Sequence, residues 1–236
     1  MTNLQSILPP DKPQTPILEP HNFFLYGAPM AGKSYFASFF PHPLSLNTDG
    51  NAEQGTAPSI QIRNLFNADG SLKQNSIYQL SSIVVALQQP NVTYQTVVVD
   101  VIDDVCTMFE QAICKQYKAL SLADIPYGKG YQLLNTSLQQ LVLDLKALPL
   151  DVVFISRELD KTDEKTARTS YVPSLKAKYY NIVNGNCDLV IHFTKIGDEY
   201  LRQVTQKRAN YKKADIKNPA VLKLLSSCNG MFTNEK

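Results

Sequence analysis

The chain has few of the residues that mark secreted, disulfide-bonded or membrane-spanning proteins. It has no tryptophan, three histidines and four cysteines among 236 residues. The cysteines form no C-x-x-C pair and have no histidine cluster beside them, so we expect buried free thiols rather than disulfides or a metal site. No apolar run approaches the ~20 residues that span a bilayer, and no basic start with an apolar core indicates a secretory leader. These absences predict a cytoplasmic protein with no membrane partner.

The net charge is also small, at +2, which excludes a polycation whose whole surface binds nucleic acid. Hydrophobic residues make up 44% of the chain, enough for one sizeable core. Five of the first twenty residues are proline, which favours an extended arm over packed structure. We therefore expect a proline-rich N-terminal arm over residues 1–21 and a single domain over residues 22–236.

The most informative segment follows an apolar run, residues 22–26, that is typical of a buried strand. Residues 27–34 then read G-A-P-M-A-G-K-S, which is the G-x-x-x-x-G-K-S pattern of a phosphate-binding loop. Its glycines let backbone N–H groups surround an anion, its lysine reaches the β- and γ-phosphates, and its serine hydroxyl can ligate Mg²⁺. We expect a helix over residues 35–40 with its N-terminus towards the phosphates. The predicted nucleotide-binding residues are Gly27, Ala28, Pro29, Met30, Ala31, Gly32, Lys33, Ser34 and Tyr35.

A second apolar run supplies the carboxylate that a nucleotide-bound metal needs. Residues 94–100 read Y-Q-T-V-V-V-D, a β-branched run that ends in Asp100. Continuous apolar runs are typical of strands buried within a parallel sheet, and ligands of such sheets bind at the carboxyl ends of the strands. We predict that Asp100 ends a strand neighbouring the loop strand and binds Mg²⁺ together with Ser34. The alternative is that Asp100 only caps the following helix.

Strands and helices alternate along the rest of the chain. Apolar runs predict strands at 44–47, 60–62, 151–156 and 189–193, and helical spacing predicts helices at 76–89, 105–117, 131–148 and 174–184. Residues 162–171 suit a hairpin or flap, and residues 198–205 suit a strand antiparallel to the preceding one. The pattern predicts an α/β fold with a mostly parallel central sheet, flanking helices and a C-terminal antiparallel β-hairpin.

In this order of motifs the chain resembles the phage AAA-type nucleotide-binding proteins with a RecA-like P-loop ATPase core, a group that includes single-strand-annealing recombination ATPases. The resemblance covers roughly residues 22–215. It rests on the phosphate-binding loop, the acidic turn at 48–51, the strand ending in Asp100 and the Ser-Arg-Glu at 156–158. It implies a RecA-like fold, ATP and Mg²⁺ as ligands, and the cytoplasm of a bacterial host. It also implies a homo-oligomeric ring or filament.

The resemblance also indicates which acidic residues could orient the attacking water. In RecA-type ATPases this residue ends the strand after the P-loop helix and is usually Glu, whereas this chain has Asp49 there. Glu158 ends the strand beside the nucleotide strand, where related folds sense the γ-phosphate. Its alternative is a surface ion pair with Arg157 or Lys161. With Lys33, the predicted catalytic residues are thus Asp49 and Glu158.

Two more acids, Asp103 and Asp104, follow Asp100 closely. They could orient water as well, but they also stand where helix caps and first-turn acids are expected. Ser156 could hydrogen-bond to the nucleotide or simply end its strand. The sequence therefore leaves the identity of the catalytic acid open among four positions.

Positive charge concentrates in the last third of the chain, where residues 157–217 hold thirteen Lys/Arg and eight Asp/Glu. A basic cluster with Tyr200 and Tyr211 nearby comprises Lys207, Arg208, Lys212 and Lys213. Phosphate contacts combined with aromatic stacking hold single strands without reading their sequence. The cluster therefore predicts single-stranded DNA as a partner. Its alternatives are a cation that acts on the γ-phosphate of a neighbouring subunit, and a solvated face without a special role.

Three functions follow from these patterns. The first is a Mg²⁺-dependent ATPase that acts on single-stranded DNA in recombination or replication. The second is a nucleotide-gated adaptor or loader with little turnover, partnering a helicase or a single-strand-binding protein, and the short acid at Asp49 favours it. A small-molecule kinase is the weakest, because Arg157 and Arg168 are the only arginines available for a lid. The absence of an N-K-x-D signature favours ATP over GTP.

Overall fold

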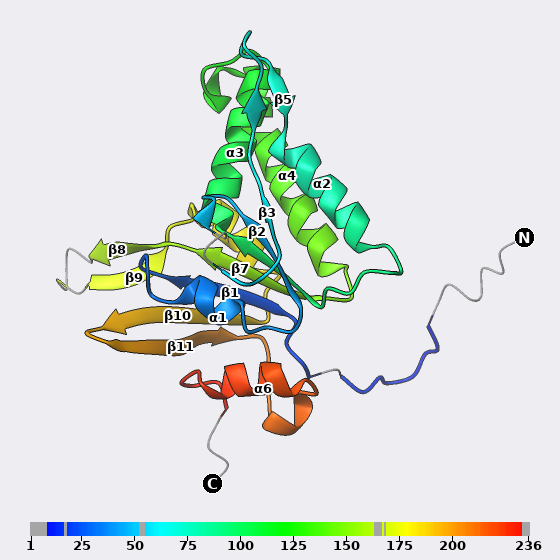
Figure 1. Ribbon diagram of the computed structural model, residues 1–236, viewed down its shortest axis with the longest axis vertical. Coiled ribbons are helices and arrows are strands. Elements are labelled where there is room, and N and C mark those ends of the chain that lie inside the picture. Colours follow the sequence, from blue (N-terminus) through cyan, green and yellow to red (C-terminus); the bar gives the residue numbers. More distant parts are fainter. Residues whose placement is uncertain (1–8, 17, 52–54, 163–166, 168, 233–236) are drawn as a thin grey trace, which may run out of the picture.

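The computed structural model describes residues 9–16, 18–51, 55–162, 167 and 169–232. Within these residues a seven-stranded sheet has the order β11-β10-β1-β7-β6-β2-β3, in which β11 alone runs antiparallel to its neighbour (Figure 1). Its strands are β1 (Asn22–Gly27), β2 (Pro43–Asn47), β3 (Ser59–Gln61), β6 (Thr96–Asp100), β7 (Asp151–Ser156), β10 (Leu189–Ile196) and β11 (Glu199–Lys207). The predicted α/β fold, with its mostly parallel sheet and terminal antiparallel pair, is confirmed.

The remaining elements surround this sheet. The α-helices in the described residues are α1 (Lys33–Ala37), α2 (Ser76–Leu87), α3 (Ile102–Gln116), α4 (Lys129–Lys146), α5 (Ala177–Asn184) and α6 (Pro219–Ser226). Two short antiparallel hairpins stand apart from the sheet. They are β4 (Leu65–Phe66) with β5 (Leu72–Gln74), and β8 (Glu158–Thr162) with β9 (Thr169–Pro173). No helix among the described residues is both long and apolar enough to cross a membrane.

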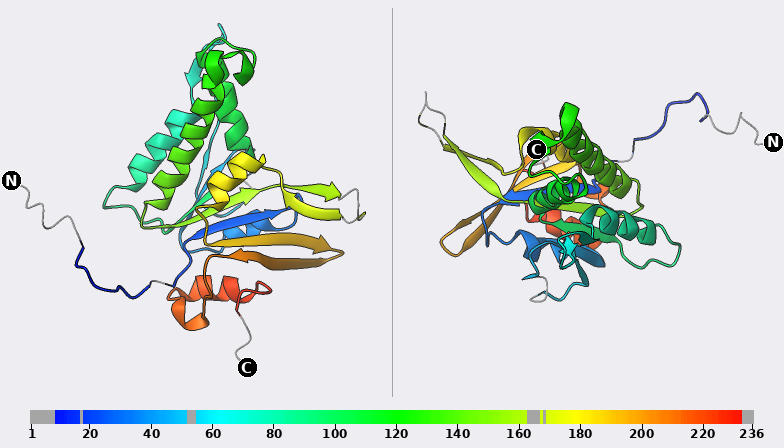
Figure 2. Two further views of the ribbon diagram at one scale, coloured as in Figure 1. Left: turned by 180° about the vertical axis from the view of Figure 1, so that it is seen from behind. Right: turned by 90° about the horizontal axis from the view of Figure 1, so that it is seen from above.

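Both faces of the sheet are buried, because side chains alternate along each strand. On β1, Phe24 and Tyr26 belong to the apolar cluster that includes side chains of α2, α3, α4 and α5. Phe23 and Leu25 belong to a second cluster formed with α1 and α6. Figures 1 and 2 show α2, α3 and α4 standing together on one side of the sheet and α6 on the other. The loop after β1 is thus held by a strand packed on both faces.

Several predicted boundaries need correction. The helix after the phosphate-binding loop is expected over residues 35–40, but it ends at Ala37. The N–H groups of Phe39 and Phe40 then donate to carbonyls three residues earlier, as in tight turns. Pro41 follows, and the residue before a proline disfavours helical backbone. Helix α3 begins three residues earlier than the apolar spacing predicts, and α5 begins three residues later than expected. Polar residues in the first turn of α3 and the bend at residues 174–175 before α5 obscure these starts. The β4–β5 hairpin was not predicted.

The strand order corrects a further expectation. The strand that ends in Asp100, β6, does not adjoin the loop strand β1, because β7 lies between them and pairs with both. The prediction of direct neighbours was wrong. Burial alone could not reveal the order, since all three strands are apolar runs that fit any interior position of a parallel sheet.

The segment that leads into β1 is tied to the body of the molecule. The described residues 9–16 are exposed and run away from the sheet in Figure 1. Closer to β1, the Lys217 N–H donates to the Glu19 carboxylate at 2.9 Å. The backbone N–H groups of His21 and Asn22 both donate to the Asp188 carboxylate at 3.0 Å. These bonds fix the entry into β1. The four cysteines are free and buried, as expected.

Candidate nucleotide-binding site

The phosphate-binding loop lies at the carboxyl edge of the parallel strands. Strand β1 ends at Gly27 and α1 begins at Lys33, so the loop joins a buried strand to a helix as the motif predicts. In register, Tyr26 of β1 is level with Ser156 of β7, and Ile155 of β7 is level with Asp100 of β6. The loop, the end of β7 and Asp100 therefore meet at one edge of the sheet.

Two glycines shape this loop for physical reasons. A Cβ atom on Gly27 would lie 2.2 Å from the carbonyl oxygen of Phe193 on β10, so only glycine lets β1 pass this close to its neighbour. Gly32 has φ +86, a left-handed conformation that favours glycine, and the ring of Tyr200 lies against it. The loop is thus held between β10 and the side chain of a β11 residue.

The ammonium group of Lys33 is folded onto the loop. The side chain is 8% exposed, and Nζ donates to the carbonyl oxygens of Gly27 and Ala28 at 2.7 Å each. Burial lowers the pKa of Lys33, while the negative charges of Asp100 and Glu158 act in the opposite direction. Phosphate oxygens are stronger acceptors for a buried ammonium than backbone carbonyls. The geometry therefore suits an exchange of these carbonyls for phosphate oxygens.

Asp100 and Ser34 lie together, as a metal site would require. Burial raises the pKa of Asp100, and the charge of Asp49 raises it further; the adjacent Ser34 hydroxyl and the Lys33 ammonium partly oppose this. Among the described residues, no group of three or more His, Cys, Asp or Glu side chains could hold a metal by itself. Asp100 and Ser34 are the two side chains that would hold Mg²⁺ together with water and phosphate oxygens, the usual arrangement for nucleotide-bound Mg²⁺.

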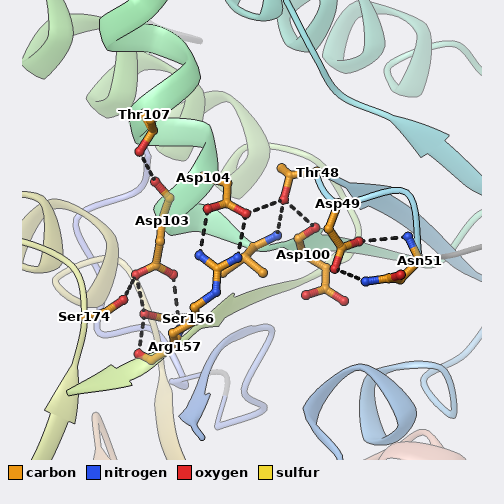
Figure 3. A network of polar contacts seen from close by, with 11 residues as sticks. Thr48, Asp49, Asn51, Asp100, Asp103, Asp104, Thr107, Ser156, Arg157 and Ser174 are labelled. Atoms are coloured by element: carbon orange, nitrogen blue, oxygen red, sulfur yellow. Dashed lines mark hydrogen bonds and ion pairs between the residues drawn. The ribbon is translucent and has the colours of Figure 1, made fainter. Parts of the chain in front are cut away.

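Asp49 occupies the position expected for it, just beyond β2. Its side chain is exposed and accepts hydrogen bonds from the backbone N–H of Asn51 at 3.0 Å and from the Asn51 side-chain amide at 2.7 Å (Figure 3). Its effect on the pKa of Asp100 shows that the two carboxylates are close. Asp49 therefore lies near the predicted metal ligand Asp100, and its carboxylate is engaged by Asn51.

Asp103 and Asp104 lie in the first turn of α3, where acidic residues were expected. Neither occupies the N-cap position, which is held by Val101. Asp103 instead accepts hydrogen bonds from the Ser156 hydroxyl at 3.1 Å, from the Arg157 N–H at 3.2 Å and from the Ser174 hydroxyl (Figure 3). It connects the start of α3 with the ends of β7 and β9. Its contacts are those of a residue that organises the site.

Asp104 forms a two-pronged ion pair with Arg157. The Nη1 and Nη2 atoms of Arg157 lie 2.7 and 2.8 Å from the two carboxylate oxygens, and the Thr48 hydroxyl donates to the same carboxylate at 3.0 Å. The hydrogen bonds from Arg157 hold the pKa of Asp104 below its usual range. Sequence reasoning considered Arg157 as a partner of Glu158 or as a lid residue and gave Thr48 no role. The only signal was the presence of polar residues at two strand ends.

Glu158 is the first residue of β8 rather than the last residue of β7. Its carboxylate lies 2.7 Å from Nε2 of His192, so the predicted surface pair with Arg157 or Lys161 is wrong. The His192 ring stacks on Tyr26 with centroids 4.6 Å apart and on Tyr171 at 6.0 Å. Glu158 is thus mostly buried and joined to both the nucleotide strand and the β8–β9 hairpin.

The basic cluster is divided in the structure. Lys207 lies level with Leu189 at the start of β10, at the edge of the sheet opposite the loop, and donates to the carbonyls of Gly230 and Met231. Arg208 donates to the carbonyls of Gly185 and Cys187 and lies 3.3 Å from Asp188. The side chains of Lys212 and Lys213 are exposed.

The aromatic residues do not interleave with this cluster as the sequence suggested. Tyr200 lies at the other end of β11, level with Lys195, and its ring packs beside the phosphate-binding loop. Tyr211 is 5% exposed and belongs to the core. Stacking with bases at Lys212 and Lys213 therefore has no support from these two tyrosines. The aromatic ring beside Lys213 is that of Phe232, whose centroid lies 5.8 Å from Nζ.

These features define a P-loop nucleoside-triphosphate-binding domain. A loop framed by two glycines joins a buried strand to a helix and carries the lysine and the serine, and an aspartate lies at the same edge of the parallel sheet. Residues 19–219 match the family described as "AAA domain". The chain belongs to this family, whose members are P-loop nucleotide-binding domains. No curated protein matches the chain.

Proposed function

We propose that the chain is a Mg²⁺-dependent ATPase of phage type that acts on single-stranded DNA in recombination or replication. The observation that supports it most is the meeting of Lys33, Ser34 and Asp100 at one edge of the sheet. The match to the AAA domain family supports nucleotide binding and ATPase chemistry in general. The phage origin and the pathway are proposed from the resemblance, and the DNA partner is proposed from the resemblance and the charge distribution.

The proposed chemistry is the transfer of the γ-phosphoryl group to water. A water oxygen forms a bond to the γ-phosphorus while the bond to the β–γ bridging oxygen breaks, which releases ADP, inorganic phosphate and a proton. Lys33 would stabilise charge on the phosphoryl oxygens, and Ser34 and Asp100 would hold Mg²⁺, which would neutralise part of the negative charge of the phosphates. The lysine and the metal would then both lie beside the phosphoryl oxygens that gain negative charge in the transition state.

Two residues remain as candidates for orienting the water. Asp49 is exposed and close to Asp100, so it lies on the metal side of the site. Burial lowers the pKa of Lys33, and the charges of Asp100 and Glu158 oppose this, which supports Glu158 as a second candidate near the lysine. Loss of the carboxylate that orients water should lower kcat by ~10²- to 10⁴-fold and change KM little. Asp49→Asn and Glu158→Gln therefore decide the assignment.

The proposed partners follow from charge. Lys212 and Lys213 are exposed and stand in the most positive part of the chain, so they can contact DNA phosphates. A homo-oligomeric ring or filament and a phage single-strand-binding protein are further proposed partners that follow from the resemblance. Within an oligomer, the same lysines could instead approach the γ-phosphate of a neighbouring subunit.

The nucleotide-gated adaptor or loader remains the second candidate, and one observation favours it. Asp49 is one methylene shorter than the usual glutamate, and its carboxylate is engaged by Asn51. An acid held in this way orients water poorly, so ATP could bind tightly and persist. The kinase gains no support from Arg157, because this side chain is paired with Asp104. The other arginine considered for a lid, Arg168, lies outside the described residues.

Steady-state ATP hydrolysis with Mg²⁺, measured with and without single-stranded DNA, tests this proposal. Lys33→Ala provides the control, because it should lower turnover by at least ~10²-fold while leaving the fold intact. Turnover that rises with DNA and disappears in the control supports the DNA-coupled ATPase. Tight ATP binding with negligible turnover in both conditions supports the adaptor, and equal turnover in Lys33→Ala would remove the central role of the loop.

A further inference from the structure

Large apolar side chains are exposed at the end of the molecule that lies opposite α6. The β4–β5 hairpin, the carboxyl end of α3 and residues 117–128, which join α3 to α4, form this end (Figure 1). Leu120 is 99% exposed, Tyr127 is fully exposed, and Phe66 and Tyr117 are exposed as well. Exposed apolar groups that gather in one place mark interaction sites. The apical surface is the set Phe66, Lys115, Tyr117, Lys118, Leu120, Tyr127 and Lys129.

The backbone that carries these side chains is fixed by packing. Leu122 and Ile125 are buried and belong to the same core cluster as side chains of α3 and α4. A Cβ atom on Gly130 would lie 2.5 Å from the carbonyl oxygen of Leu122, so the start of α4 lies directly against this segment. Tyr127 has φ +59, a left-handed conformation that a bulky residue seldom adopts. The segment therefore presents Leu120 and Tyr127 in a fixed conformation, which lowers the entropy lost when a partner binds.

A groove of about 980 Å³ opens beside Leu120, where the carboxyl end of α3 lies against the β4–β5 hairpin. Phe66 and Ala119 contribute to its apolar lining together with Leu120. Ligand pockets are commonly ~300–1,000 Å³ in volume and mostly apolar. The groove is therefore large enough to take large apolar side chains of a partner.

Ammonium groups surround this apolar lining. Lys115 and Lys118 line the groove, and Lys129 lies beside Tyr117. All three lysines are exposed. In the described part of the chain, no carboxylate lies within ion-pair distance of any of them. Their charges are therefore available to a partner.

Two acids at this end of the molecule are turned towards donors of their own turns. Asp69 accepts hydrogen bonds from the Ser71 N–H at 2.9 Å and from the Ser71 hydroxyl at 2.6 Å. Asp124 accepts hydrogen bonds from the Ser121 N–H at 2.8 Å and from the Ser121 hydroxyl at 3.0 Å. Glu110 of α3 also lines the groove. A partner that covers the apical surface must supply acceptors for the ammonium groups, because a buried charge without a partner is costly.

Two observations favour an acidic peptide over a nucleic acid as this partner. The Nζ atom of Lys115 lies 5.6 Å from the centre of the Phe66 ring, and that of Lys129 lies 5.3 Å from the centre of the Tyr117 ring. One face of each ring is thus occupied by a cation, which hinders the stacking by which proteins hold single strands. Leu120, the second observation, is an aliphatic side chain that offers a base no ring to stack on.

We propose that the apical surface binds an acidic segment of a partner protein. Large apolar side chains of this segment enter the groove beside Leu120 and pack against Tyr127. Its carboxylates pair with Lys115, Lys118 and Lys129. Tyrosines on a fixed backbone are typical of the residues that contribute most to protein–protein binding. The proposal does not depend on the proposed ATPase, because no residue of the nucleotide site belongs to the apical surface.

Selection from a displayed library of random dodecapeptides, with the full-length chain as the target, tests the proposal without a known partner. The selected peptides should be enriched in Asp and Glu and in large apolar residues. The tightest of them should lose at least ~10-fold in affinity for Leu120→Ser, because the side chain beside the groove is lost. It should lose as much for the double variant Lys115→Gln and Lys118→Gln, whose affinity should also depend less on salt. Both variants should keep the wild-type melting temperature, because the altered side chains are exposed.

The matched controls are Leu143→Ser, which removes an exposed leucine from α4, and the double variant Lys178→Gln and Lys223→Gln, which removes two exposed ammonium groups elsewhere. Both should change peptide affinity by less than ~3-fold. Peptides that bind Leu120→Ser as tightly as the wild type, or a selection that yields no peptide, would overturn the proposal. Binding of single-stranded DNA that falls by ~10-fold or more in Leu120→Ser would overturn it in favour of a nucleic-acid surface. A dimer that light scattering detects in the wild type but not in Leu120→Ser would overturn it in favour of a second copy of the chain.

Discussion

At the scale of residues, the site contains ionisable side chains whose burial disfavours their charged forms. Lys33 is buried with a lowered pKa, and Asp100 is mostly buried with a raised pKa. Both shifts show that burial disfavours the charged forms. Groups kept charged in such surroundings are typical of functional sites, and each has an expected use: the lysine for phosphate and the aspartate for metal.

Replacing the predicted metal ligand tests this division. Asp100→Asn preserves the shape of the side chain but removes the negative charge that attracts Mg²⁺, so the Mg²⁺ concentration needed for half-maximal nucleotide binding should rise by ~10- to 100-fold. Nucleotide affinity in the presence of a chelator should change by less than ~3-fold, because Lys33 and the loop amides remain. Calorimetric titrations with Mg²⁺ and with a chelator measure both. An equal loss in both conditions would show that Asp100 supports the loop rather than the metal.

His21 offers a pH-dependent test of how the N-terminal segment is fixed. Its hydrogen bond to Asp151 raises the pKa of the imidazole, an effect that burial partly opposes. A raised folded-state pKa stabilises the fold fully below the unfolded value of about 6.5 and loses this stabilisation as pH rises through the folded value. His21→Gln should therefore lower the melting temperature at pH 5.5 more than at pH 9. The difference should be small because half of the His21 side chain is exposed. A difference that grows with pH would contradict the assignment.

Sequence reasoning reached some of these residues and missed others for a physical reason. The loop residues are contiguous, and Asp100 ends an apolar run, so local patterns point to both. Arg157 and Asp104 are 53 residues apart, and Glu158 and His192 are 34 apart. Their pairing depends on which strand ends become neighbours, and local patterns do not encode that.

At the scale of elements, the carboxyl ends of β2 and β7, the hairpin β8–β9 and the first turn of α3 form one connected unit. Asp103 binds Ser156 at the end of β7 and Ser174 after β9, and Asp104 binds Thr48 after β2. The hairpin is also joined to β10 through the Glu158–His192 contact. These contacts link the base of the hairpin to the sheet edge that carries the phosphate-binding loop.

The basic segment after β11 gives a prediction at this scale. Reversing Lys212 and Lys213 to Glu should weaken binding to single-stranded DNA by ~10-fold or more and reduce the dependence of affinity on salt by about one to two counterions. The same charge change at Lys73 and Lys118, which belong to the β5 and α3 end of the molecule, serves as the control. Fluorescence anisotropy with a labelled oligonucleotide over a range of salt concentrations measures both. Equal losses in the two double variants would reflect net charge alone, and no loss at Lys212 and Lys213 would remove them from the DNA surface.

At the scale of the whole molecule, alternating strand and helix patterns were sufficient to predict a parallel sheet with helices on both faces, but they did not predict the strand order. Connections between parallel strands are right-handed, but this rule does not determine how many strands a connection passes over. Strand β7 therefore enters between β1 and β6 without a local signal. That insertion places the two residues that follow β7, Arg157 and Glu158, between the strands that carry the loop and Asp100.

The most direct test of the account is a calorimetric titration of Mg²⁺ with ATPγS into the wild-type chain and into Lys33→Ala. The account predicts one nucleotide per chain in the wild type, an affinity that falls when Mg²⁺ is chelated, and a loss of at least ~10-fold in the variant while its melting temperature is retained. Equal binding by a folded Lys33→Ala variant, or no binding by the wild type, would contradict a nucleotide site at this loop.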